Sequence, residues 1–254
     1  MIVLLFLRTV FGWLAILVAT MTHAFLIVLG GESGFSERVL RRWARFFLWV
    51  TGARLIVQCD LPLDPQKSYV YISNHTSNLD APAILAAVDR PLRFIAKQEL
   101  SRIPVFGWAA RRMGHVFIDR KDRKGSTRAI RSRIDKGLGG VALFFFAEGT
   151  RSTTDALLPF KKGAAVAAIE TGLDCVPIGL AGARDVLKPK GLSVFQPGPV
   201  AVVFGPPIPV LGHSIEERDQ LVEVQREAVE RAVAEARALV SAARGAKVGG
   251  RWRG

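Results

Sequence analysis

Apolar side chains dominate the first thirty positions of the chain. Residues 9–30 form a run of 22 positions without a formally charged side chain, and a helix of that length can cross the roughly 30 Å hydrocarbon layer of a membrane. We therefore expect a membrane-associated helix here. Thr20, Thr22 and His23 leave open a bent form, in which two short helices lie in one leaflet. A cleaved signal peptide is a further alternative.

Arginines flank this apolar run mainly on its C-terminal side. Arg8 precedes it, and four arginines follow it at Arg38, Arg41, Arg42 and Arg45. The positive-inside rule then places the rest of the chain in the cytoplasm, at the inner face of the cell membrane. The same distribution argues against a signal peptide, because the basic residues of a signal peptide precede its apolar segment.

Residues 35–50 mix apolar and basic positions at helical spacing. The apolar positions are Phe35, Val39, Leu40, Trp43, Phe46, Phe47 and Val50. A basic amphipathic helix on the membrane surface has this pattern, and so does a helix packed on the main domain. Both interpretations stay open.

From Gly52 onward, short apolar runs alternate with segments of helical periodicity. The runs expected to form strands are 54–59, 68–73, 92–97, 114–119, 141–146, 175–180 and 200–204. The helices expected between them are 79–88, 104–112, 125–136 and 162–171. This alternation predicts an α/β domain with a mostly buried sheet flanked by helices.

A long helix is expected near the end of the chain. Ser214 and Glu217 have the spacing of a capping box, and apolar positions recur at helical spacing to about Ala243. The glycine-rich, basic tail that follows is expected to be disordered. The predicted organisation is an anchoring segment, a main domain and a tail, at residues 1–50, 51–244 and 245–254.

Charge and cysteine content narrow the choice of partners and compartment. Thirty-five Lys and Arg against 22 Asp and Glu give a net charge of +13, which favours anionic lipid, phosphorylated substrates or nucleic acid. No nucleic-acid recognition motif accompanies the charge, so we expect no nucleic-acid partner. Cys59 and Cys175 lie in apolar runs without a C-x-x-C pair. We expect both to be small core residues in a reducing compartment.

Candidate chemistry begins directly after the second expected strand, where the sequence reads NHTSNLD. If Ser77 or Asn78 caps the next helix, with Pro82 in its first turn, the side chains of His75 and Asp80 can meet. An aspartate that accepts from one imidazole nitrogen leaves the other nitrogen as a general base. The alternative is a polar helix cap that contains an incidental histidine.

Three further stretches follow expected strands, at the edge where open α/β sheets place their sites. Lys97 and Arg120 belong to a basic stretch that could hold a phosphate. Gly149 permits a tight turn, and the planar guanidinium of Arg151 suits a phosphate. Pro177 lies in an apolar stretch and indicates an edge strand, a bulge or the wall of a tunnel.

Four motifs occur in a fixed order along the chain. They are N-H-x-S-x-x-D at 74–80, K-x-E-L…P…G…G…I-x-R at 97–120, E-G-T-R-S at 148–152 and V-P-I at 176–178. In order and spacing they resemble the lysophosphatidic acid acyltransferase family, the 1-acyl-sn-glycerol-3-phosphate O-acyltransferases. The resemblance covers roughly residues 50–205 and implies a glycerolipid acyltransferase-like α/β fold.

The resemblance also implies a role for each motif. In the family, the histidine matching His75 takes the proton from the acceptor hydroxyl, and the aspartate matching Asp80 orients that histidine. Pro177 falls in the motif linked to the acyl donor. The implied substrate-binding positions are Lys97, Arg120, Glu148, Gly149, Thr150 and Arg151, with Arg151 facing the acceptor phosphate.

One position departs from the family pattern. The residue before Glu148 is usually proline in the family and is Ala147 here. We expect this change to loosen the loop that places Arg151, with more effect on acceptor specificity than on catalysis.

The implied reaction transfers an acyl group from acyl-CoA or acyl carrier protein to lysophosphatidic acid, giving phosphatidic acid. An acyl thioester is already activated, so no covalent intermediate is needed, and the chain has no G-x-S-x-G motif. We expect no cofactor and no metal, because the histidines lack ligand spacing. The alternatives are the same chemistry on another lysolipid, such as a lyso-ornithine lipid, and a non-catalytic protein that binds membrane lipid.

Overall fold

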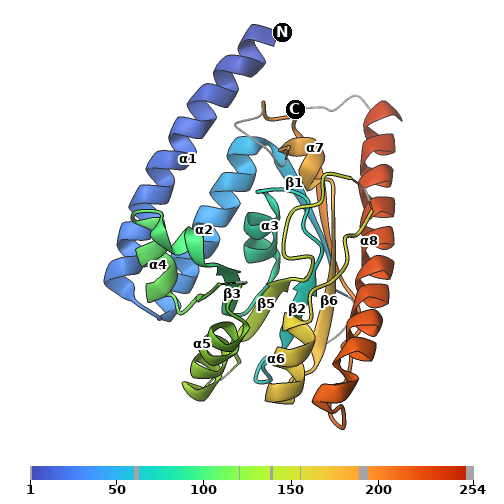
Figure 1. The fold of residues 1–254 in the computed structure, drawn as a ribbon. Coiled ribbons are helices and arrows are strands. Elements are labelled where there is room, and N and C mark those ends of the chain that lie inside the picture. The colour runs from blue at the N-terminus through green and yellow to red at the C-terminus, as the bar shows by residue number, and fades with distance from the viewer. Residues whose placement is uncertain are drawn as a thin grey trace.

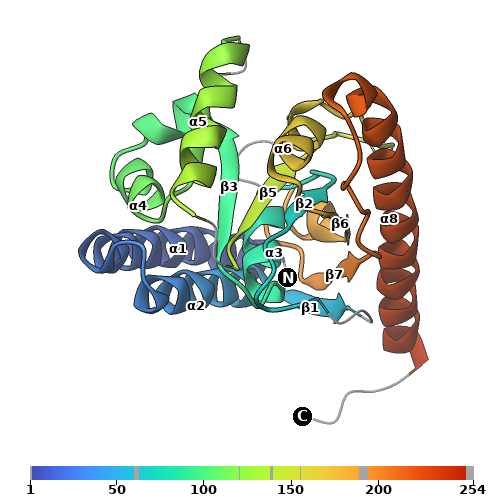
Figure 2. The same cartoon turned by 90° about the horizontal axis from the view of Figure 1, so that it is seen from below.

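The computed structural model describes residues 2–59, 63–119, 121–137, 140–154, 156–188 and 194–249. Within these residues the centre is a seven-stranded sheet in the order β1-β7-β6-β2-β5-β3-β4, with helices on both faces (Figure 1, Figure 2). Neighbouring strands are parallel except β6 and β7, which are antiparallel. This architecture confirms the α/β fold class.

The elements follow the hydrophobic pattern closely. The strands are β1 (Ala53–Gln58), β2 (Val70–Ser73), β3 (Leu92–Lys97), β4 (Val116–Ile118), β5 (Ala142–Phe146), β6 (Cys175–Ala181) and β7 (Gly198–Phe204). The α-helices are α1 (Ile2–Gly30), α2 (Gly34–Thr51), α3 (Asp80–Ala87), α4 (Phe106–Arg112), α5 (Arg123–Asp135), α6 (Gly163–Thr171), α7 (Ala183–Val186) and α8 (Arg218–Gly249). Two 3-10 turns are η1 (Gln98–Arg102) and η2 (Ile215–Glu217). Strand β4 is shorter than expected because Gly114 (φ 74°) turns the chain before it.

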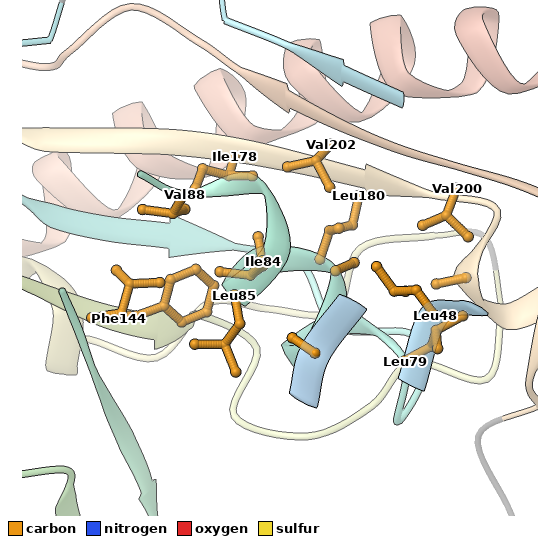
Figure 3. Packing of buried hydrophobic residues seen from close by; sticks show 14 of the residues in the cluster. Leu48, Leu79, Ile84, Leu85, Val88, Phe144, Ile178, Leu180, Val200 and Val202 are labelled. Carbon is orange, nitrogen blue, oxygen red and sulfur yellow. The ribbon is translucent and has the colours of Figure 1, made fainter. Parts of the chain in front are cut away.

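Helices cover the two faces of the sheet as separate layers. Side chains alternate along β2, so Tyr71 packs in the core shared with α2 and α3, whereas Val70 packs in the core shared with α6 and α8. Figure 3 shows Ile84 of α3 packed with Phe144 of β5 and Ile178 of β6. The interior strands of the sheet are therefore buried on both faces.

Helix α8 lies along β6 and β7 (Figure 2). A Cβ atom on Gly179 of β6 would lie 2.1 Å from the carbonyl carbon of Ala232 in α8, so this close approach requires glycine. The helix continues through Gly249, past Ala243 and into the tail that we expect to be disordered. Residues 250–254 lie outside the described residues.

Helix α1 is continuous from Ile2 to Gly30. Thr20, Thr22 and His23 each bond to the carbonyl four residues earlier, at 2.7, 3.0 and 2.7 Å. Their polar groups are satisfied within one helix, so this segment does not break into two. By length and composition, residues 6–30 could cross a membrane, and only 22% of the most apolar 18-residue window of this stretch is buried.

Helix α2 packs on the main domain, which confirms one of the two interpretations of residues 35–50. Ala44 and Leu48 are buried against α3 and the sheet. Arg38, Arg42 and Arg45 are exposed on its other face. Helix α1 lies against α2 and α4 on the outside of this layer (Figure 1).

An ion-pair network with two buried arginines joins the α1–α2 connection to the sheet. The Arg93 side chain of β3 is 2% exposed and contacts Glu32 at 3.0 Å and Glu37 at 2.7 Å. Arg133 of α5 contacts Glu32 at 2.6 Å. Four charged side chains from four segments therefore hold the N-terminal helices on the domain.

The two cysteines differ in burial. Cys175 opens the interior strand β6 and is buried, as predicted. Cys59 is exposed, so the prediction of a core position is wrong for this residue. It follows β1, which is an edge strand of the sheet and is only partly covered.

Candidate active site

Two loops at the C-terminal ends of β2 and β5 carry the candidate catalytic residues. The strands are parallel neighbours, with Ser73 opposite Phe146 at their ends. The loops that begin at residues 74 and 147 therefore leave the sheet side by side, as expected for a site in an α/β sheet.

His75 and Asp80 meet in the first loop. Nδ1 of His75 lies 2.8 Å from Oδ2 of Asp80, whose side chain is fully buried. The same oxygen accepts the main-chain N–H groups of Thr76 at 2.6 Å and Ser77 at 2.8 Å. A carboxylate at Nδ1 keeps the proton of the neutral ring on that nitrogen, so Nε2 is free to accept one.

The imidazole of His75 faces a large apolar cavity. Its ring stacks on Phe146 with centroids 3.8 Å apart and planes 14° apart. The cavity has a volume of about 500 Å³ and extends from His75 between α1, α2, α3 and α4. Its walls include Trp13, Leu85 and Met113. This arrangement places a basic nitrogen at the end of a space that suits a hydrocarbon chain.

Two side chains of the first loop anchor it to β6 and α7. Asn74 exchanges two hydrogen bonds with the backbone of Leu180, at 2.8 and 3.0 Å. The Ser77 hydroxyl donates to the Leu187 carbonyl at 2.6 Å. The residue that caps α3 is Leu79, with no side-chain cap bond, so the capping role expected of Ser77 or Asn78 is wrong.

Glu148 supports His75 from the second loop. Its Oε1 accepts the main-chain N–H of His75 at 2.8 Å, and its Oε2 accepts that of Leu158 at 2.9 Å. Burial raises the pKa of this carboxyl, against the lowering effect of the two backbone donors. Ser152 N–H donates to the carbonyl of His75 at 2.8 Å. Both loops are thus bound to each other around the candidate base.

The rest of the second loop lies at the surface of the site. Gly149 has a φ of 71°, which glycine adopts without strain, and it lines the cavity. Thr150 is exposed. Nη1 of Arg151 donates to the side-chain oxygen of Asn78, and this contact brings the guanidinium to the loop that carries His75.

Ala147 is held firmly, contrary to the loosening that we expect from its replacement of proline. Its N–H donates to the Ser73 carbonyl at 2.9 Å, and its carbonyl accepts from Lys161 N–H at 2.7 Å. Proline has no N–H and could not make the first of these bonds. The second loop therefore gains a link to β2 at this position.

The remaining predicted site residues are Lys97, Arg120 and Pro177. Lys97 ends β3, lines the cavity and pairs with Glu99 at 2.7 Å. Arg120 lies outside the described residues. Pro177 is in an interior strand, so the edge-strand interpretation is wrong. It sits where the β6–β7 ladder ends and accepts from Gly205 N–H at 2.8 Å, so its missing N–H costs little there.

Sequence reasoning overlooked the residues that position the histidine. Asn74, Ser77 and Ser152 make the anchoring bonds described above, and Phe146 supplies the ring beneath the imidazole. All four lie in or next to the motifs, so their place in the motifs was the available signal. Their partners are up to 110 positions away along the chain, which local pattern does not reveal.

Comparison with known proteins gives consistent matches. The family model described as Acyltransferase matches residues 50–181. A 1-acyl-sn-glycerol-3-phosphate acyltransferase of Chlamydomonas reinhardtii is 35% identical over 65% of this chain and 48% of its own length. One of Pseudomonas aeruginosa is 31% identical over 73% of this chain and 74% of its own length. The chain spans about half the length of the first curated relatives that it matches.

A solved structure agrees with these matches along nearly the whole chain. The crystal structure of the 1-acyl-sn-glycerophosphate (LPA) acyltransferase PlsC from Thermotoga maritima superposes with a TM-score of 0.75 and 26% identity. The match covers 98% of each chain. Together, the family model, the relatives and this neighbour show that the chain belongs to the lysophosphatidic acid acyltransferase (1-acyl-sn-glycerol-3-phosphate acyltransferase) family.

Proposed function

We propose that this chain transfers an acyl group from acyl-CoA or acyl carrier protein to the sn-2 hydroxyl of 1-acyl-glycerol 3-phosphate, giving phosphatidic acid. The contact between His75 Nδ1 and Asp80 Oδ2 at 2.8 Å carries the proposal. It prepares a free imidazole nitrogen at the end of an apolar cavity, which a protein that only binds lipid does not need. The names of the relatives support this acceptor and product.

The proposed transfer is direct. Nε2 of His75 takes the proton from the sn-2 hydroxyl as its oxygen attacks the thioester carbonyl, and a C–O bond forms. The C–S bond then breaks, and the proton passes from Nε2 to the departing sulfur. Asp80 orients the ring and stabilises its charged form. General-base action of this kind contributes a factor on the order of 10² to 10⁴ in rate.

The cavity supports a role in holding an acyl chain. Its volume of about 500 Å³ and its apolar walls suit a hydrocarbon. Burying each methylene group favours binding by about 0.8 kcal/mol. A chain held there would place its carbonyl carbon at the His75 end.

Arg151 and Lys97 are proposed to bind the acceptor phosphate. Arg151 reaches the His75 loop through Asn78, and Lys97 lines the same cavity. A phosphate that replaced the neutral amide oxygen of Asn78 would form a stronger, charge-assisted bond with the guanidinium. Arg120 belongs to this proposed group on the strength of its motif alone.

Helix α1 is proposed to anchor the protein to the cytoplasmic face of the inner membrane. Only 22% of the most apolar window of residues 6–30 is buried, although this stretch also forms part of the cavity wall. Acceptor and product are both lipids, so an anchored site can take the acceptor from the leaflet without extracting it into water. The net charge of +13 favours an anionic lipid surface.

The test is an acceptor comparison with purified protein. Acyl transfer to lysophosphatidic acid, lyso-ornithine lipid and a lysophospholipid with a larger head is measured for the parent protein, for Arg151→Ala and for Arg231→Ala. The last is a control, since Arg231 is exposed on α8. We expect Arg151→Ala to raise the KM for lysophosphatidic acid about tenfold or more, as for a lost hydrogen bond to a charged group. Unchanged acyl transfer to the preferred acceptor by Arg151→Ala would refute the phosphate-binding role of Arg151. Lipid binding without turnover in the parent protein would refute the enzymatic proposal.

A further inference from the structure

The cavity that ends at His75 contains another histidine, which has no part in the proposed transfer. His115 lies between α4 and β4 and lines the cavity. Its ring is edge-on to Phe94, with centroids 5.6 Å apart. Phe94 contacts Phe146, and Phe146 stacks on His75. His115 is thus connected to the candidate base by a row of aromatic rings along the cavity.

The hydrogen bonding of His115 determines which nitrogen carries its proton. The main-chain N–H of Phe94 donates to Nδ1 of His115 at 3.2 Å. A backbone N–H can only donate, so Nδ1 is unprotonated and the neutral ring carries its proton on Nε2. Burial, together with the charges of Arg93 and Arg133, lowers the pKa of His115 to about 3. The ring is therefore neutral at neutral pH, with a donor at Nε2.

This donor has no partner within the part of the chain that the structure describes. The only hydrogen bond of the His115 ring there is the one at Nδ1. A plain alkyl chain that filled the cavity would displace water and leave the Nε2–H group unpaired, which is unfavourable in an apolar site. An oxygen on the chain would satisfy the group instead.

A second histidine on the cavity wall, His23, offers a hydrogen-bond acceptor. His23 of α1 lines the same cavity, and its Nδ1 lies 2.7 Å from the Ala19 carbonyl. A carbonyl can only accept, so Nδ1 of His23 carries the proton and Nε2 is an acceptor. These two histidines therefore add a donor and an acceptor to the cavity wall, and a hydroxyl group both accepts and donates.

We propose that His115 makes the site selective for acyl chains that carry a hydroxyl group, by donating a hydrogen bond from Nε2 to the hydroxyl oxygen. The inference rests on the proposed function, because it assigns the cavity to an acyl chain. That chain can belong to the acyl donor or to the sn-1 position of the acceptor. The chemistry is the same in both cases, and separate arms of the experiment distinguish them.

The experiment compares hydroxylated and plain chains of equal length as a ratio of kcat/KM. One arm uses hydroxyacyl-CoA with a plain acceptor, and the other uses plain acyl-CoA with an acceptor whose sn-1 chain is hydroxylated, each over a series of hydroxyl positions. The parent protein is compared with His115→Phe, which keeps an aromatic ring and removes the donor. A ratio within one variant cancels a general loss of activity or of folded protein.

We expect the parent protein to favour the hydroxylated chain at one or more positions in one arm, and the ratio there to fall about tenfold in His115→Phe. His115→Gln retains a donor and an acceptor and should keep part of the preference. His115→Leu serves as a second donor-free variant if His115→Phe does not fold. Arg231→Ala, at an exposed position of α8 away from the cavity, should leave the ratio unchanged.

Two results would overturn the inference. One refutes the role of His115 alone, and the other refutes the proposed function as well. Transfer of plain chains with the same ratio in parent protein and donor-free variant, at every hydroxyl position in both arms, would refute the role of His115 alone. Absence of transfer of any chain by the parent protein would refute the proposed function and this inference with it.

Discussion

The main-chain N–H of His75 donates to the buried carboxylate of Glu148 at 2.8 Å. The loop after β5 therefore holds the backbone of the candidate base, which lies in the loop after β2. The other carboxylate oxygen accepts from Leu158 N–H at 2.9 Å. Each oxygen thus accepts a main-chain N–H from a different loop segment. Glu148 therefore supports the backbone of the loop that carries His75.

Glu148→Gln should lower kcat while the protein still folds. Whichever way the new amide is placed, its NH2 group faces a backbone N–H that needs an acceptor. An unsatisfied buried group costs about 1–3 kcal/mol, which would displace the His75 loop and reduce kcat about tenfold or more. The measurement is kcat and KM for lysophosphatidic acid beside a thermal unfolding curve. Glu216→Gln, at an exposed position, is the control, and an unchanged kcat in Glu148→Gln would contradict the positioning role.

Asp80→Asn should reduce kcat by a factor on the order of 10² to 10⁴ with little change in acceptor binding. The neutral amide no longer stabilises the charged imidazole, and it can hold His75 with the wrong nitrogen protonated. Steady-state kinetics, with a separate binding measurement for lysophosphatidic acid, checks both parts. Transfer at the parent rate would mean that the 2.8 Å contact has only a structural role.

Arg93→Leu should destabilise the protein by about 1–3 kcal/mol, because it leaves the mostly covered carboxylate of Glu37, 12% exposed, without its cation. Glu37 loses a contact of 2.7 Å, and Glu32 keeps only Arg133. The free energy of unfolding, from denaturant titration in detergent, gives the value. Arg231→Leu, at an exposed position of α8, is the matched control. A loss below about 1 kcal/mol would show that the network contributes little to holding the N-terminal helices.

Stability should depend on pH through His115. Its pKa falls from 6.5 to about 3 on folding, so between these values the unfolded chain binds more protons than the native protein. Native stability is therefore complete above pH 6.5 and falls by up to about 1.4 kcal/mol per unit as the pH drops towards 3. His115→Phe lacks this contribution, so the free energy of unfolding of the parent minus that of the variant should fall from pH 7 to pH 5. Parallel curves for the two proteins would contradict a buried, neutral His115.

The elements of the fold were predictable because their signal is local. Strands buried on both faces appear as apolar runs, and the run at 92–97 coincides with β3. Spacing within one motif likewise brought His75 and Asp80 within reach of each other. The motif after β5 placed Arg151 beside the same loop, because adjacent parallel strands end at one edge of the sheet.

The hydrophobic pattern of each segment does not predict the order of strands in the sheet. The wrong predictions for Pro177 and Cys59 follow from this. Pro177 fits an interior strand only because the β6–β7 ladder ends there, and Cys59 is exposed because β1 is at the edge. The bonds from Asn74 to Leu180 span 106 positions of the chain. Such contacts depend on which strands become neighbours, which the hydrophobic period of each strand does not specify.

The most direct test of the proposed reaction is the rate at which purified His75→Ala makes phosphatidic acid from lysophosphatidic acid, with acyl-CoA and with acyl carrier protein as donors. The parent protein should turn over with at least one donor. His75→Ala should fold, bind the acceptor and lose a factor on the order of 10² to 10⁴ in kcat. Transfer by His75→Ala at the full parent rate would contradict His75 as the base.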